Sequence, residues 1–80
     1  MNLEDTEIRL LQRNIERKIV EENLLNPEKL IDFTEENQNQ QSRTKYKLIF
    51  ELSNNRNLIL IVAFGRNIIV ITALIRYRNG

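Results

Sequence analysis

The sequence predicts a small α+β domain in which two N-terminal helices pack on a three-stranded antiparallel sheet, in the chain order α-α-β-β-β. Three patterns predict it: apolar residues at helical spacing before residue 25, alternating apolar and polar residues over 45–52, and two apolar runs that flank Gly-Arg-Asn between 58 and 76. Eighty residues suffice for a single domain, 1–80, with a helical part 4–33, a polar loop 34–42 and a sheet 43–76.

The helices are predicted from a stripe of apolar residues near the N-terminus, which shares one helical face: Ile8, Leu11, Ile15 and Ile19. Asn14 tolerates the left-handed conformation that ends a helix, and Leu10 and Val20 lie away from the stripe. The sequence therefore predicts two helices, about 4–13 and 15–25, rather than one long helix.

Proline closes the second helix, because the residue before Pro27 is pushed out of the helical conformation. Residues 27–33 are predicted to form one further helical turn, with Pro27 at its first position. The segment 34–42 contains no apolar residue and is predicted to be a solvated loop.

The first strand is predicted over 45–52, where Tyr46, Leu48, Phe50 and Leu52 alternate with mostly polar residues. This pattern is typical of a strand with one solvent-exposed face, and we place it at the edge of the sheet. Tyr46 is in phase with Leu48 and Phe50, so it is expected to pack in the core.

Two further strands, 58–64 and 68–76, are predicted on either side of the turn at Gly65-Arg66-Asn67. A transmembrane interpretation of this apolar run is opposed by that turn and by its many β-branched residues. Both strands are apolar on both faces, so both faces need cover, and the last strand would keep one edge open. We therefore expect a partner surface, either a second copy or another protein, at the last strand.

Composition excludes several chemistries. The chain contains no histidine and no cysteine, which removes Ser-His and Cys-His nucleophiles, thiolate metal sites and disulfides. We expect no metal and no cofactor. Residues 1–5 lack a basic region followed by an apolar run, so no secretory signal is visible and a cytoplasmic location is expected.

Charge is distributed unevenly along the chain. Residues 1–33 carry eight acidic and five basic side chains, a balance of −3, whereas residues 34–80 carry three acidic and seven basic ones, a balance of +4. Cationic side chains suit phosphate groups, and the candidate anion- or RNA-binding residues are Arg9, Arg13, Lys45, Arg66 and Arg76. A solvated, salt-bridged helix face is the alternative for Arg9, Arg13 and Arg17, because Asp5 and Glu21 lie at matching spacing.

Several short motifs resemble a family of small bacterial domains of unknown function, which looks like a compact relative of the RelE/ParE toxin superfamily. The motifs are Arg9-x-x-x-Arg13-x-Ile15, Leu25-Asn26-Pro27-Glu28-x-Leu30-Ile31, Tyr46-x-Leu48 and Ile69-Val70-Ile71-Thr72-Ala73. The resemblance implies a RelE/ParE-toxin-like fold and cleavage of RNA or another toxin action that an antitoxin holds in check. Family members commonly carry a histidine four residues before the first arginine, where this chain has Asp5.

Two functions are therefore expected, and nonspecific binding of nucleic acid through the same cations is a third hypothesis. The first is a toxin-like protein of the RelE/ParE type, directed at RNA and paired with an antitoxin. The alternative is a non-catalytic interaction module that forms a homodimer through its last strand. No membrane partner is expected.

Overall fold

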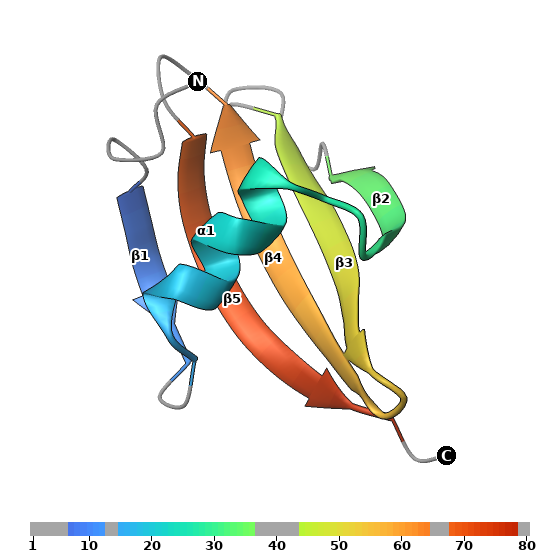
Figure 1. The fold of residues 1–80 in the computed structure, drawn as a ribbon. Helices are drawn as coiled ribbons and strands as arrows, with labels where there is room; N and C mark the ends of the chain where they lie inside the picture. Colours follow the sequence, from blue (N-terminus) through green and yellow to red (C-terminus); the bar gives the residue numbers. More distant parts are fainter. Residues whose placement is uncertain (1–6, 13–14, 37–43, 65–67, 79–80) are drawn as a thin grey trace.

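The computed structural model describes residues 7–12, 15–36, 44–64 and 68–78. They form one helix and a five-stranded mixed sheet of order β1-β5-β4-β3-β2, in which β1 runs parallel to β5 and every other pair is antiparallel. The helix lies across one face of the sheet (Figure 1). The elements are β1 (Glu7–Leu11), α1 (Arg17–Leu25), β2 (Leu30–Glu36), β3 (Lys45–Ser53), β4 (Arg56–Phe64) and β5 (Ile68–Tyr77).

The predicted antiparallel meander of three strands is confirmed as β3, β4 and β5. Lys45 pairs with Ala63 across the first hairpin, and Leu58 pairs with Ile75 across the second. The alternation in β3 and the continuous apolar runs of β4 and β5 therefore predicted both the strands and their order. The turn predicted at 65–67 lies outside the described residues.

The predicted fold class is wrong, because the chain order is β-α-β-β-β-β and only one helix is described. Over 7–11, where the first helix was expected within 4–13, the chain is strand β1, and Ile8 pairs with Val70. Ile8-Arg9-Leu10 also fits a period of two. A short isolated helix is only marginally stable in water, whereas the edge of β5 offers free backbone N–H and C=O groups for pairing. Tertiary pairing thus decides the conformation of this segment.

The predicted turn of helix over 27–33 is also wrong. Residues 28–29 form a turn, and β2 starts at Leu30, which pairs with Phe50 of β3. The strand continues to Glu36, so the first three residues of the predicted loop 34–42 belong to β2, and the rest lies outside the described residues. Strand β3 is therefore an interior strand, not an edge.

The open edge predicted for the last strand is closed by β1, which pairs with β5 from Ile69 to Ala73. The two edges of the sheet are instead the short strands β1 and β2. Over these residues the edge of β5 is therefore not open to self-pairing with a second copy. Dimerisation itself stays a prediction.

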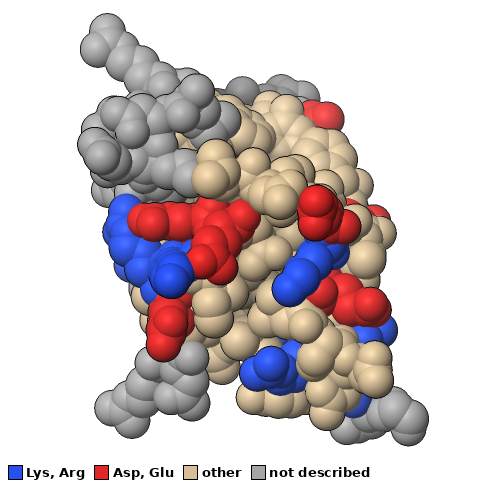
Figure 2. Space-filling model, viewed as in Figure 1, with Lys and Arg blue, Asp and Glu red and all other residues tan. Residues whose placement is uncertain are grey.

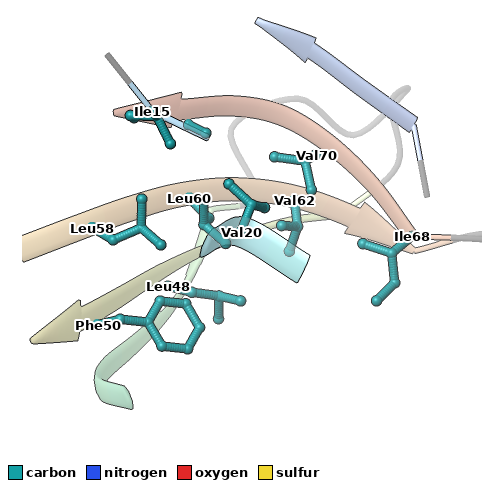
Figure 3. Packing of buried hydrophobic residues seen from close by; sticks show 10 residues of the cluster. Ile15, Val20, Leu48, Phe50, Leu58, Leu60, Val62, Ile68 and Val70 are labelled. Carbon is teal, nitrogen blue, oxygen red and sulfur yellow. The ribbon is translucent and has the colours of Figure 1, made fainter. Parts of the chain in front are cut away.

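The core lies between α1 and the sheet (Figure 3). Val20 of α1 is fully buried and packs with Leu60 and Val62 of β4, which are also fully buried. Tyr46 packs against this cluster as expected, and its ring centroid lies 5.2 Å from that of Phe33 and 5.3 Å from that of Phe64. The other buried members of the cluster are Ile15, Leu48, Phe50, Leu58, Ile68, Val70 and Ala73.

The second predicted helix is confirmed as α1, although it begins at Arg17 rather than at residue 15. Its buried polar residue, Asn23, donates a hydrogen bond of 2.8 Å from Nδ2 to the carbonyl oxygen of Ile19, so its amide group is not buried without a partner. The hydropathy and length of the described helix are insufficient for it to cross a membrane.

Candidate functional site

The surface that needs explanation is the side of the sheet opposite α1, which we call the helix-free face. Side chains alternate along a strand, and residues directly opposite each other on neighbouring strands share a face. Since Leu48, Leu60 and Val70 face the helix, their strand neighbours face away from it. Residues that are paired across neighbouring strands form rows on the helix-free face, and we call each row a level. The four levels are Glu36, Lys45, Ala63 and Ile69; Thr34, Lys47, Ile61 and Thr72; Asp32, Ile49, Ile59 and Leu74; and Glu51, Asn57 and Arg76.

The centre of the helix-free face is apolar. Ile59 and Ala63 of β4 are only 5% and 4% exposed, yet neither belongs to the cluster under the helix. Their neighbours on the same face, Ile49, Ile61, Ile69 and Leu74, are half-buried. No described helix or strand covers this second apolar layer.

The register shift between Ile61 and Val62 makes Ile71 an extra residue in β5, and Ile71 lies on the helix-free face as well. A bulge re-aims side chains locally, and here it lets β5 present Ile69 and Ile71 to the same hollow. This strand therefore contributes more apolar surface to the helix-free face than strict alternation would allow.

Polar residues surround the apolar centre. Strand β3 contributes Lys45 and Lys47 at one end and Glu51 at the other, and β5 contributes the exposed Arg76, one residue before its end. Asn57 lies between Glu51 and Arg76 in register, and its Oδ1 atom is buried with no hydrogen-bond partner among the described residues. The hairpin end of the face thus carries one acidic and one basic side chain on either side of an amide.

Two of the predicted anion-binding residues meet on this face. Arg9 of β1 and Lys45 of β3 line one open hollow of about 250 Å³, together with Ala63, Ile69 and Ile71. Their sequence positions differ by 36, and the pairing of β1 with β5 brings them together. Arg9 also makes an interaction within the protein.

The other predicted residues do not join them. Arg76 pairs with Asn57, whereas the hollow lies beside Ala63, six residues along β4, which is about 20 Å in a strand. Arg13 and Arg66 lie outside the described residues. The predicted set is therefore not one site, and the alternative of one salt-bridged helix face fails for Arg9, which is on a strand.

On the side of the molecule that carries α1, basic and acidic side chains are interspersed on the surface (Figure 2). Arg17 Nε lies 2.6 Å from Glu21 Oε1, and Lys18 Nζ lies 3.8 Å from Glu22 Oε1. These i, i+4 pairs are typical of a helix face that remains in water.

The helix side also has an apolar groove of about 230 Å³ between the C-terminal part of α1 and strands β2 and β3, and it includes the exposed Phe33 and Phe64. A second hollow, of about 340 Å³, follows the end of α1 and is lined by Glu22, Asn23, Leu25, Asn26, Glu28 and Lys29. Among the described residues, neither hollow is lined by a serine, threonine or cysteine.

The chemistry available to the helix-free face is that of contact and charge recognition. The whole chain lacks histidine and cysteine. Within the described ranges, no three carboxylate-bearing residues come together in a way that could hold a metal ion. Isoleucines inside a ring of Lys, Arg, Asp and Glu resemble the apolar core and polar rim of a protein interface.

The apolar character of β4 and β5 on both faces could be predicted from the sequence, but the set of residues that meet on the helix-free face could not. The missing element was β1, whose only local signal is the alternation of Ile8, Arg9 and Leu10. Without β1, neither the position of Arg9 beside Lys45 nor the closed edge of β5 can be deduced.

The comparisons with known proteins add no family or function to this geometry. The chain matches no family model, and no curated protein and no solved structure shows significant similarity to it.

Proposed function

We propose that this protein is a non-catalytic interaction module that acts with its helix-free face buried against another protein surface. The observation that carries the proposal is the two-sided apolar character of β4 and β5, of which α1 covers one side. An antiparallel sheet with one solvated face normally alternates apolar and polar residues. Strand β3 follows that rule at Lys45, Lys47 and Glu51, whereas Ile59, Ile61 and Ala63 of β4 do not.

Burial of the helix-free face by a partner is energetically favourable. Full burial of an isoleucine side chain is worth about 1.5–3 kcal/mol, so completing the burial of a half-buried one contributes about 1 kcal/mol. Ile49, Ile61, Ile69, Ile71 and Leu74 are all half-buried on this face. A partner surface would gain from each of them.

The distribution of charge supports the same surface. The exposed side of α1 already pairs its charges within the helix, at Arg17–Glu21 and Lys18–Glu22. Exposed ion pairs of this kind contribute little free energy, so this side of α1 would add little to the affinity for a partner. The helix-free face, by contrast, has an apolar centre and a charged rim.

The test compares the native assembly of three forms of the full chain in fresh lysates by size exclusion. The wild type is expected to elute well above the 9.6 kDa of one chain. Ile61→Glu places a carboxylate in the apolar centre, beside Lys47, which limits its cost to the fold. It should elute as a monomer, and Leu25→Glu on the 71% exposed Leu25 of α1 should behave as the wild type.

Circular dichroism establishes that each variant is folded. If Ile61→Glu does not fold, Thr72→Lys provides the test, because position 72 is already polar and pairs with Ile61. Elution of the wild type at the size of one chain would contradict the proposal. So would an assembly that survives both substitutions on the helix-free face.

The second candidate is the RNA-directed activity that the resemblance implies. One observation favours it: Arg9 and Lys45, two residues expected to face an anion, line the same hollow. Guanidinium and ammonium groups at such a hollow suit a phosphate. Its test is growth arrest and RNA cleavage on induction in bacteria, compared between the wild type and Arg9→Ala/Lys45→Ala.

A further inference from the structure

We infer that the partner on the helix-free face is a second copy of this chain, related by a two-fold axis parallel to β4. The inference rests on the proposed function, since it names the occupant of the same face. It follows from where the apolar and charged residues stand relative to the middle strand of the sheet.

The order of the strands makes such a pairing possible. Strand β4 is central in the order β1-β5-β4-β3-β2 (Figure 1). A two-fold axis that runs along β4, between two helix-free faces, places β4 opposite its own copy. It also places β5 opposite the partner's β3 and β1 opposite the partner's β2. The strands of the two sheets then run in the same direction, as in the aligned packing of β-sandwiches.

The apolar residues match under this operation. Residues at one level of the sheet stay at that level, so Ile59, Ile61 and Ala63 of β4 meet their own copies. Leu74 of β5 and Ile49 of β3 share a level, and each therefore faces the other across the interface. The centre of the contact is then apolar on both sides.

The charged residues match as well. Glu51 of β3 and Arg76 of β5 share the level of Asn57, one strand to either side of the axis. The two-fold therefore brings Arg76 of each copy opposite Glu51 of the other, and two such contacts form per dimer. Glu51 is bound through Oε2 to Arg78 of its own chain, which leaves Oε1 for the second arginine.

The other end of the face follows the same rule. Lys47 stands at the level of Thr72, and the hydroxyl can accept a hydrogen bond from the ammonium group across the interface. Glu36 of β2 shares the level of Ile69, and Arg9 of β1 lies beside that level. The surface is complementary to itself, as an isologous interface requires.

The size of the face is sufficient. Strands β3, β4 and β5 have nine or ten residues each, and β1 and β2 have five and seven. At about 3.3 Å per residue and about 4.8 Å between strands, they cover roughly 630 Å². Stable interfaces bury about 600–1,000 Å² per partner. The face of one sheet is therefore close to the area that a dimer needs.

The test is a charge exchange measured on purified protein by sedimentation at concentrations up to about 100 µM. The wild type should be a dimer. Glu51→Arg and Arg76→Glu should each raise the dissociation constant about tenfold or more, because each places two like-charged contacts in the dimer. An equal mixture of the two variants should form a heterodimer about as tight as the wild type, since both contacts across the interface are again between opposite charges.

Alternative orientations predict different results. A two-fold axis across the strands would place Glu51 opposite Lys45 rather than Arg76, and the mixture would then not restore association. Thermal unfolding followed by circular dichroism separates weakened association from loss of the fold, which matters because Glu51→Arg also removes the pair with Arg78.

A second measurement does not depend on charge. The chain has no cysteine, so Ile61→Cys gives a single thiol that stands opposite its own copy on the axis. A short bismaleimide should link it into a covalent dimer, because facing sheets lie about 10 Å apart, which is too far for a disulfide. The same reagent should not link Leu25→Cys, on the exposed side of α1. Lack of cross-linking in Ile61→Cys would overturn the two-fold axis along β4.

The outcomes separate this inference from the proposed function. A purified wild type that stays monomeric, together with a lysate assembly that Ile61→Glu disrupts, overturns the second copy and leaves a different protein as the partner. A monomer in both settings overturns both.

Discussion

The backbone N–H of Ile75 donates a hydrogen bond of 2.6 Å to Oε1 of Gln12, across 63 positions of sequence. The backbone N–H of Gln12 in turn donates a hydrogen bond of 3.0 Å to the carbonyl oxygen of Ala73. Gln12 thus extends the pairing of β1 with β5 beyond Leu11, first with its main chain and then with its side chain. This residue helps to close the edge that the sequence left open.

Gln12→Ala should loosen β1, because it removes the acceptor of the Ile75 amide. The free energy of unfolding should fall by about 0.5–1.5 kcal/mol, the usual net value of one hydrogen bond. Hydrogen exchange at the Ile75 amide should become faster. Gln12→Glu keeps an acceptor oxygen at the same position and serves as the control. An unchanged exchange rate in Gln12→Ala would contradict the role of this contact.

Arg78 is expected to hold the end of β5 against the β3–β4 hairpin. Its Nη2 atom donates hydrogen bonds to the carbonyl oxygens of Ser53, at 3.0 Å, and Asn54, at 2.6 Å, and lies 3.1 Å from Glu51 Oε2. Arg78→Ala should lower the free energy of unfolding by about 1–2 kcal/mol, measured in urea.

The control for Arg78 is Lys18→Ala, which removes an exposed helix pair with an N–O distance of 3.8 Å. It should change the free energy of unfolding by about 0.5 kcal/mol or less. Equal effects of the two substitutions would show that the contacts of Arg78 with the hairpin add nothing beyond surface charge.

Asn57→Val should leave the free energy of unfolding unchanged or raise it by up to about 1 kcal/mol. The Oδ1 atom of Asn57 is buried without a partner among the described residues, and such an acceptor carries a desolvation cost that valine does not. Valine also suits a strand. A loss of more than about 1 kcal/mol in thermal or urea unfolding would mean that the amide makes a favourable interaction.

Self-association should depend little on pH between about pH 5.5 and 7.5, because the chain has no histidine, the side chain whose ordinary pKa falls in that range. The dissociation constant of the purified protein should vary by less than about threefold across the window. A larger change, measured by sedimentation at constant salt, would contradict an interface held by apolar contacts and Glu–Arg pairs.

The RNA-directed candidate predicts that induction in bacteria arrests growth and yields cut transcripts. Arg9→Ala/Lys45→Ala should abolish both effects, because it empties the hollow of its two cations. Lys18→Ala/Lys29→Ala removes the same number of positive charges from the helix side of the molecule and the turn before β2, and it should retain both effects. Normal growth with intact RNA in cells that express the wild type would remove this candidate.

The strands β3, β4 and β5 could be predicted from the sequence because their patterns are local. Tyr46 and its alternating neighbours indicate one buried face, and the apolar runs around 65–67 indicate two. Helix α1 was also predicted, since Ile15 and Ile19 are at helical spacing and Pro27 closes the segment. Each of these segments has a conformation that its own residues favour.

Strands β1 and β2 could not be predicted in this way. The segment from Ile8 to Leu11 fits both a helical and an extended period, and residues 27–33 begin with a proline that suits the first turn of a helix. Their conformation depends on hydrogen bonds to β5 and β3, which lie far away in the sequence. The same is true of the candidate site, since only these pairings place Arg9 beside Lys45.

The amino-acid sequence by itself determined the apolar hairpin, its neighbouring strand, the helix and the need for cover on two sides, because side-chain periodicity encodes which faces avoid water. The tertiary structure alone decided that β1 and β2 occupy the edges, that the helix covers one face, and that Glu51 and Arg76 share a level on the other. Strand pairing is a contact between distant segments, and backbone hydrogen bonds form with any sequence that reaches a free edge.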